Sequence, residues 1–148
     1  QGYYADAAIT LAIGKVSLLA QTLIHVTKQA LDKAITAALP GRTLGDIGYA
    51  IEKVANDHGF KIIKGLTGHG IGKRLHEEPS IFNERVPGRG LKLNPGMVLA
   101  IEPMISAGSN QVYQLGDDSY ATEDGSLSAH FEHTVAILPN GNEVLTMI

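Results

Sequence analysis

The sequence predicts an α+β fold in which two helices cover a mainly antiparallel sheet. Three observations support this prediction. The chain opens on a segment of alternating character, two segments with helical spacing follow it, and short strand-like runs separated by glycine-rich loops fill the chain from residue 60 onward. Because the two helical segments are consecutive and the strands come after them, the helices are expected to lie together on one face of the sheet.

The opening segment, residues 3–13, carries large apolar side chains mostly at every second position and therefore predicts a half-buried strand. Asp6 falls on the more polar face of this strand. Ser17 is expected to cap a long helix that reaches about residue 39, where a Pro-Gly pair ends it.

The second helix is expected to begin after Thr43, because Asp46 three residues later completes a capping-box pattern. It is expected to end near residue 58, just before a glycine. Strand patterns then cover residues 61–64, 97–102, 111–115, 129–138 and 143–147, with a loop at 83–95.

Composition restricts the kind of protein this is. With 148 residues, 44% of them hydrophobic, the chain is long enough for one domain with a core. The net charge of -3 and the lack of a basic block argue against nucleic-acid binding. No apolar run reaches membrane-spanning length and no signal-peptide pattern opens the chain, so a cytoplasmic protein without membrane contact is expected. The start at Gln1, directly on a strand pattern, indicates a piece of a longer polypeptide.

The residues best suited to catalysis or metal binding are two histidines and three carboxylates. Residues 68–79 read Gly-His-Gly-Ile-Gly-Lys-Arg-Leu-His-Glu-Glu-Pro and contain His69 and His76. Asp6, Glu102 and Glu132 each stand in a strand-like context, where a buried carboxylate is costly unless a cation or hydrogen-bond donors neutralise it. Because cysteine is absent, a metal must be held by oxygen and imidazole ligands. Together these residues predict a hydrolytic metal site.

Taken singly, each of these residues also has an ordinary interpretation. Asp6 alone is typical of a surface strand, and a histidine between glycines is often a loop residue. Glu77 and Glu78 fit solvated loop charges better than ligands. His130 shares the face of Glu132, so it is expected to line the site without binding metal. The joint occurrence of the set is what favours a metallohydrolase.

The motifs resemble those of type I methionine aminopeptidases over essentially the whole chain. The resemblance lies in the histidine motif at 68–79, the Pro-Gly-Met of 95–97, the Ile-Glu-Pro-Met of 101–104 and the Ala-His-Phe-Glu-His-Thr of 129–134. It implies the pita-bread (creatinase/aminopeptidase) fold, with residues 1–148 forming the C-terminal part of a single catalytic domain whose N-terminal half lies upstream. The family pattern includes a further aspartate upstream of Asp6, and Ala5 stands where glycine is usual. The family pattern also includes a tryptophan, whereas this chain has none.

The resemblance also implies roles for individual residues. Asp6 and Glu132 match the carboxylates that bridge two divalent ions, and His69 matches the single histidine ligand. Glu102 matches a ligand that also transfers protons, and His76 matches the histidine that hydrogen-bonds the substrate. The ions would be cobalt, manganese, iron or zinc. The implied substrates are nascent polypeptides that begin with methionine followed by a small residue, and ribosome association is a further expectation.

The motifs leave two other interpretations open. Prolidases and aminopeptidase P share the His-Gly run and the Ile-Glu-Pro, but their last motif usually reads Arg-Ile-Glu-Asp, whereas residues 131–134 here read Phe-Glu-His-Thr. A non-catalytic pita-bread module that binds proteins is the second alternative. Such modules characteristically lose metal ligands, and each ligand that this chain could contribute is present.

Overall fold

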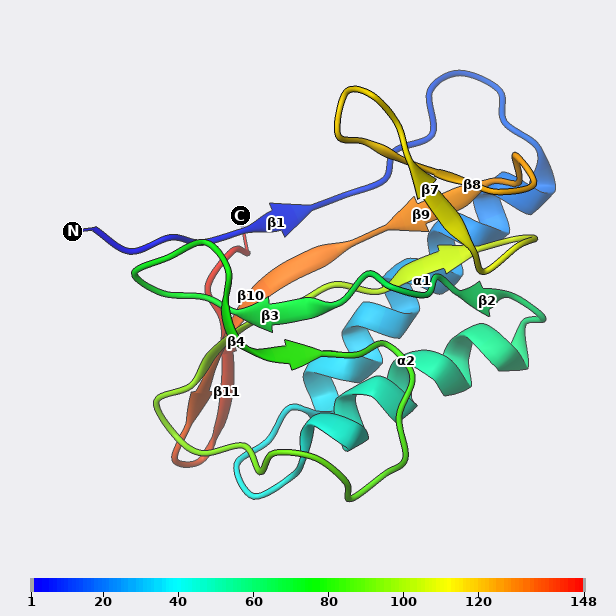
Figure 1. Cartoon of the computed structure of the whole chain (residues 1–148). Helices are drawn as coiled ribbons and strands as arrows, with labels where there is room; N and C mark the ends of the chain where they lie inside the picture. The colour runs from blue at the N-terminus through cyan, green and yellow to red at the C-terminus, as the bar shows by residue number, and fades with distance from the viewer. Residues whose placement is uncertain (1, 148) are drawn as a thin grey trace.

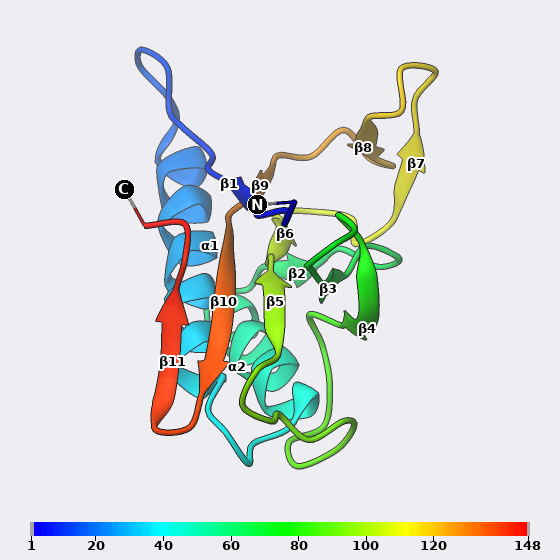
Figure 2. The same ribbon diagram turned by 90° about the vertical axis from the view of Figure 1, so that its left-hand side faces the viewer.

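The computed structural model describes residues 2–147. Two helices, α1 (Leu18–Ala37) and α2 (Leu44–Asp57), pack against each other and cover one face of a curved sheet. Figures 1 and 2 show this two-layer arrangement, with a small hairpin projecting from one end of the sheet. The predicted α+β architecture with two helices is therefore confirmed for the described residues.

Both helices begin where their capping residues predict. The Ser17 side chain accepts a hydrogen bond from the backbone of Ala20. Thr43 and Asp46 form a complete capping box, in which each side chain accepts from the other residue's backbone N–H. These bonds satisfy N–H groups that have no partner within the helix, so the two starts are determined locally.

The main sheet is antiparallel throughout and has the strand order β1-β10-β5-β3-β4, with β11 also paired to β10. A second sheet has the order β2-β6-β9, and β7 pairs with β8 in the projecting hairpin. The strand bounds are β1 (Ala7–Ala8), β2 (Lys61–Ile62), β3 (Gly68–Gly70), β4 (Glu77–Ile81), β5 (Val98–Ile101), β6 (Met104–Ser106), β7 (Val112–Gln114), β8 (Tyr120–Thr122), β9 (Ser128–His130), β10 (Glu132–Leu138) and β11 (Gly141–Val144).

The core lies between the helices and one face of the sheet. Leu99 and Ile101 of β5 and Val135 and Ile137 of β10 are fully buried against the helices. Because side chains alternate along a strand, the same strands turn their intervening residues to the other face. Glu132 of β10, together with Glu102 directly after β5, is therefore directed away from the helices.

The prediction of a half-buried strand over residues 3–13 is largely wrong. Only Ala7 and Ala8 form a strand, and the alternating apolar side chains are exposed: Ile9 is 64% and Ile13 is 84% accessible. The segment lies along β10, with which Ala7 and Ala8 pair. The Asp6 backbone and the Thr10 hydroxyl add further hydrogen bonds to the sheet. Among the described residues, nothing covers its apolar face.

The strands β3, β4, β6 and β8 had no expected counterpart in the sequence. In β3, glycine replaces the apolar residues that would mark a strand, because the neighbouring backbone comes too close for a side chain. A Cβ at Gly68 would collide with the carbonyl oxygen of Ala100, and a Cβ at Gly70 with that of Glu78. The expected strand at 129–138 is divided into β9 and β10 at Phe131, and the last strand starts earlier than expected.

Candidate metal centre

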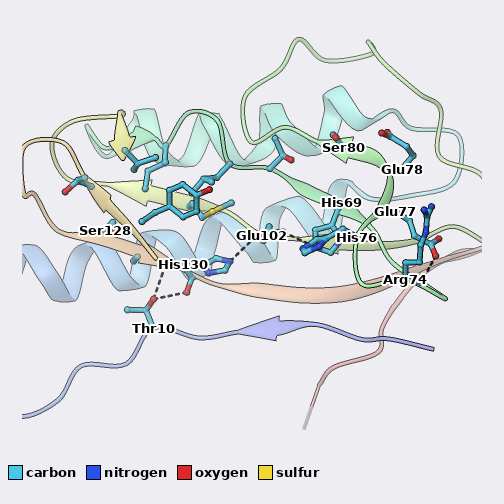
Figure 3. A pocket seen from close by; sticks show the side chains of 18 residues that line it. Thr10, His69, Arg74, His76, Glu77, Glu78, Ser80, Glu102, Ser128 and His130 are labelled. Atoms are coloured by element: carbon cyan, nitrogen blue, oxygen red, sulfur yellow. Dashed lines mark hydrogen bonds and ion pairs between the residues drawn. The ribbon is translucent and has the colours of Figure 1, made fainter. Parts of the chain in front are cut away.

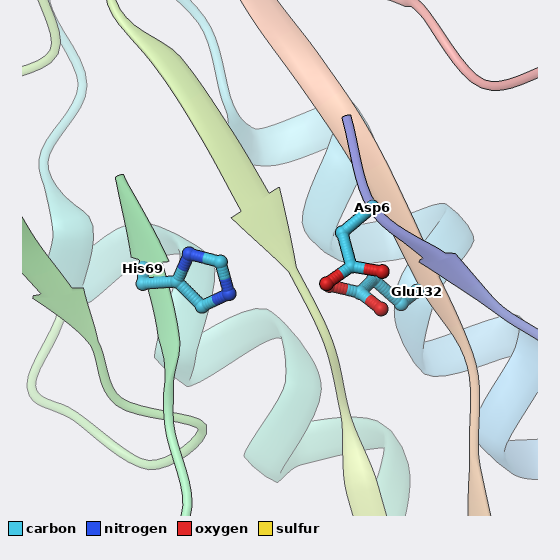
Figure 4. A group of neighbouring side chains, drawn as sticks. All are labelled: Asp6, His69 and Glu132. Carbon is cyan, nitrogen blue, oxygen red and sulfur yellow. The ribbon is translucent and has the colours of Figure 1, made fainter. Parts of the chain in front are cut away.

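Three predicted ligands come together from strands that are far apart in the sequence. Asp6, His69 and Glu132 each offer one ligand atom, and these atoms all lie within 4.8 Å of one another. Figure 4 shows the three side chains pointing toward one another. His69 and Glu132 are buried, and Asp6 is half-buried. The cluster lies on the sheet face opposite the helices.

His69 is held in one orientation by its own strand. Ala100 of β5 is its partner in the sheet, and the flanking glycines allow that close pairing. The ring nitrogen Nδ1 lies 2.9 Å from the carbonyl oxygen of Gly70. A carbonyl only accepts, so Nδ1 carries a hydrogen, and in the neutral ring Nε2 then keeps a lone pair. That lone pair points into the cluster, as a metal-ligating histidine requires.

Asp6 is positioned by Thr134 of β10. The Asp6 backbone N–H donates to Thr134 Oγ1 at 2.8 Å, and the same hydroxyl donates to the Asp6 carbonyl oxygen at 2.8 Å. Thr134 lies two residues beyond Glu132 on the same face of the strand. The clamp therefore places the Asp6 carboxylate beside that of Glu132 although the two residues are far apart in the chain.

Glu102, directly after β5, lies next to the cluster and contacts it through His69. Its Oε1 lies 3.4 Å from His69 Nε2, and its Oε2 lies 3.4 Å from His130 Nε2. The backbone carbonyl of Glu102 accepts from the amide of buried Asn83 at 2.9 Å. In the neutral form of His69, two acceptor atoms face each other across the 3.4 Å gap. Two ligands of one cation are separated by about 3.0–3.4 Å when their bonds to it measure about 2.1 Å.

The electrostatics of the cluster also suit a cation. Burial, together with the neighbouring carboxylates of Glu102 and Asp6, raises the pKa of Glu132 to about 7, although His130 acts in the opposite direction. Several carboxylates in a buried site repel one another unless a positive charge neutralises them. Carboxylate oxygens with one imidazole nitrogen are a donor set that divalent metals accept. The residues present therefore fit a divalent metal.

A cavity of about 850 Å³ opens beside the cluster. Figure 3 shows His69, His76, Glu102 and His130 along its wall, and the lining also includes apolar side chains such as Met104 and Val112. The His76 ring packs edge-on against the His69 ring, with centroids 4.4 Å apart. His76 is exposed to the cavity, so it is available to a molecule bound there.

Some residues near the site differ from what the sequence predicted. Glu77 and Glu78, expected as loop charges, instead begin strand β4, and the half-buried Glu77 accepts a hydrogen bond from the Arg74 backbone at 2.8 Å. Thr10 and Asn83, which hold His130 and Glu102, were not expected at the site. Thr10 follows the period of Asp6 along the polar face and was in principle detectable. Asn83 lies in a loop, where no periodicity marks it.

Residues 1–139 match the model of metallopeptidase family M24. The chain belongs to this family. It is 48% identical to the methionine aminopeptidase of Clostridium acetobutylicum over 147 residues, which is 99% of this chain and 59% of that protein. The methionine aminopeptidase of Aquifex aeolicus is 47% identical, with 98% of this chain and 57% of that protein covered. The chain thus spans less than two thirds of the length of these relatives.

Solved structures agree with this assignment. The methionine aminopeptidase of Thermotoga maritima matches with a TM-score of 0.97 and 44% identity, covering all of this chain and 60% of that one. Dipeptidase PepE from Mycobacterium ulcerans matches with a TM-score of 0.76 and 32% identity, covering 99% of this chain and 34% of that one. The predicted pita-bread fold and the resemblance to methionine aminopeptidases are confirmed, and family M24 implies use of a divalent metal. Within the described residues, neither helix has the length and apolarity needed to cross a membrane.

Proposed function

We propose that this chain is the C-terminal part of the catalytic domain of a metal-dependent methionine aminopeptidase. The observation that carries the proposal is the convergence of Asp6, His69 and Glu132, with Glu102 in contact with His69, in a chain of family M24. The chain is 40–48% identical in sequence to proteins named methionine aminopeptidase but 32% identical to the dipeptidase PepE, which supports the aminopeptidase activity over that of a dipeptidase.

Asp6, His69, Glu102 and Glu132 would hold the metal, and we propose two divalent cations drawn from cobalt, manganese, iron or zinc. When bound, such ions activate a water molecule and polarise a substrate carbonyl. The carboxylates of Asp6 and Glu132, which lie side by side, would supply the negative charge that neutralises the cations.

Glu102 is the proposed proton carrier of the reaction. Its carboxylate lies between the cluster and the cavity, with a side chain only 12% exposed. From this position it takes a proton from the attacking water and delivers it to the leaving amine, as a general base and then a general acid. His76, at the cavity wall next to His69, donates a hydrogen bond to the amide at the cleavage site and stabilises the charge that develops there.

The proposed substrates are nascent polypeptides with an N-terminal methionine followed by a small residue. The apolar part of the cavity lining, with Met104, Val112 and Tyr120, supports binding of an apolar side chain. Work on nascent chains is expected to take place in the cytoplasm and in association with the ribosome. Nucleic-acid and membrane binding are not part of the proposal.

A peptide assay on the product of the full reading frame, loaded with Co²⁺ or Mn²⁺, tests the function. Release of methionine from Met-Ala-Ser is expected, and Asp6→Asn should abolish it. Cleavage of Xaa-Pro peptides without release of methionine would replace the proposal with a prolidase activity. If calorimetry detects no divalent-metal binding to this protein, the chain is a non-catalytic module.

A further inference from the structure

His130 is a half-buried histidine that the proposed reaction leaves without a role. It comes from β9, next to the cluster, and its Nε2 atom is shielded from solvent. The nearest ionisable group is Glu102, whose Oε2 lies 3.4 Å from this nitrogen. Nε2 has no other hydrogen-bond partner among the described residues. A shielded polar atom facing a single carboxylate oxygen points to a specific contact between the two.

The backbone of His130 is fixed on both sides. In the β6–β9 pairing it lies opposite Met104, two residues beyond Glu102, which brings its ring alongside that carboxylate. The Thr10 hydroxyl donates to the His130 carbonyl oxygen at 2.8 Å and accepts from its N–H at 2.9 Å, as Figure 3 shows. The backbone that carries the ring is therefore fixed next to Glu102, so the ring has a short, defined reach to that carboxylate.

Glu102 needs a donor on this side. Its Oε1 faces His69 Nε2, which in the neutral ring with Nδ1–H directed at Gly70 has no hydrogen to donate. Asn83 holds only the backbone carbonyl of Glu102. The free oxygen, Oε2, therefore meets His130 as its nearest side-chain partner among the described residues. The 3.4 Å separation is longer than a formed hydrogen bond, and such catalytic contacts commonly tighten once a site is loaded.

We infer that His130 is a positioning residue whose Nε2–H donates to Oε2 of Glu102, which keeps Oε1 directed at His69 and the metal ligands. A glutamate has three rotatable side-chain bonds, and a carboxylate held at one oxygen only can turn away from its reaction partner. Loss of a residue that orients a metal ligand by a hydrogen bond typically lowers metal affinity or activity about 10- to 100-fold. This inference deepens the proposed function, and its kinetic test rests on that function.

The kinetic test compares two substitutions in the metal-loaded product of the full reading frame. His130→Gln keeps a donor near the place of Nε2, whereas His130→Leu fills similar space without one. His130→Leu is expected to lower kcat about 10- to 100-fold with little change in KM, and His130→Gln to retain most of kcat. His25→Leu, on the exposed side of α1, is the matched control and should leave both constants unchanged. Equal loss in both His130 variants, or none in either, would overturn the inference.

A second test is independent of activity. Nitrogen-15 NMR of the histidine rings in the metal-free protein reports which ring nitrogen carries the proton, and the signals absent from His130→Gln identify this residue among the six histidines. A protonated Nε2 whose resonance moves in Glu102→Gln is expected. An unprotonated Nε2 would overturn the inference. If the NMR result is as expected but no methionine is released, only the proposed function fails.

Discussion

The two faces of the same strands differ in what they contribute. On the helix side, β5 and β10 present Leu99, Ile101, Val135 and Ile137, all fully buried in an apolar core. On the other side, the neighbouring residues are the carboxylates Glu102 and Glu132, also largely shielded from solvent. Burial of the first set stabilises the fold, because apolar surface leaves water. Burial of the second set costs free energy, because charged groups lose hydration.

This difference shows where function is placed in the fold. A buried carboxylate is costly unless a cation or hydrogen-bond donors neutralise it, and the core on the opposite face offsets its cost. Substitutions on the two faces should therefore affect different properties of the protein. Changes on the helix face should lower stability, and changes on the open face should lower activity or metal binding while stability is kept.

The largest expected effect is that of Glu102→Gln on the open face. Loss of the proton carrier should lower kcat for Met-Ala-Ser by about 10²- to 10⁴-fold, while the far-ultraviolet circular dichroism stays the same. The matched control is Glu84→Gln, an exposed loop residue away from the cluster. Turnover close to the unsubstituted value would remove Glu102 from proton transfer.

On the helix face, Leu99→Ala should act on stability instead. Leu99 is fully buried in the core, so its truncation leaves a cavity and should cost about 2–5 kcal/mol of unfolding free energy. Urea denaturation of the metal-free protein measures this loss. Leu145→Ala, at a largely exposed position, should cost far less. Similar costs for the two variants would contradict the assignment of the core to this face.

Metal should stabilise the protein through the open face only. A cation that binds the folded state at about 100 times its Kd adds about 2.7 kcal/mol of stability. Thermal melting with and without Co²⁺ should show this as a rise in Tm, which Glu132→Gln should largely remove and Leu99→Ala should leave intact. A chelator should reverse the rise. An unchanged metal response in Glu132→Gln would exclude Glu132 as a ligand.

The smallest effect concerns Asp46, far from the cluster at the start of α2. Hydrogen bonds from Thr43 lower the pKa of Asp46 below its ordinary value of 3.8, and further contacts with Gly88 and Arg42 lower it too. The folded pKa lies below the unfolded one, so its stabilising effect is complete above pH 3.8 and is lost as pH falls through the folded value. Because Asp46 is partly exposed, the loss should be below about 1 kcal/mol.

The free energy of unfolding of the wild type and of Asp46→Asn, measured by urea denaturation from neutral pH to about pH 3, checks this effect. The variant should lose less stability than the wild type over the acidic part of the range. Asp57→Asn, at the other end of the same helix, is the control. Parallel pH curves for the wild type and Asp46→Asn would show that the capping carboxylate does not contribute through its charge.

Much of the fold was accessible from the sequence because its signals are local. Ser17 and the Thr43–Asp46 pair mark the helix starts by hydrogen bonds within four residues. The alternation in β10 separates Glu132 from Val135 without any tertiary information. The motifs around His69, Glu102 and Glu132 likewise indicated a metal site before any geometry was known. The glycine strand β3 and the orientation of residues 3–13 were missed, since both depend on what lies opposite them.

The sequence by itself determined where the two helices begin, which face of β10 is apolar and which residue types could hold a cation. Tertiary structure alone decided the rest: that Thr134 clamps Asp6 beside Glu132, that Asn83 holds Glu102, and that Thr10 anchors His130. The physical reason is distance along the chain. A cap or an alternation is set by neighbouring residues, whereas these contacts join segments up to 128 residues apart and exist only once the sheet has brought their backbones together.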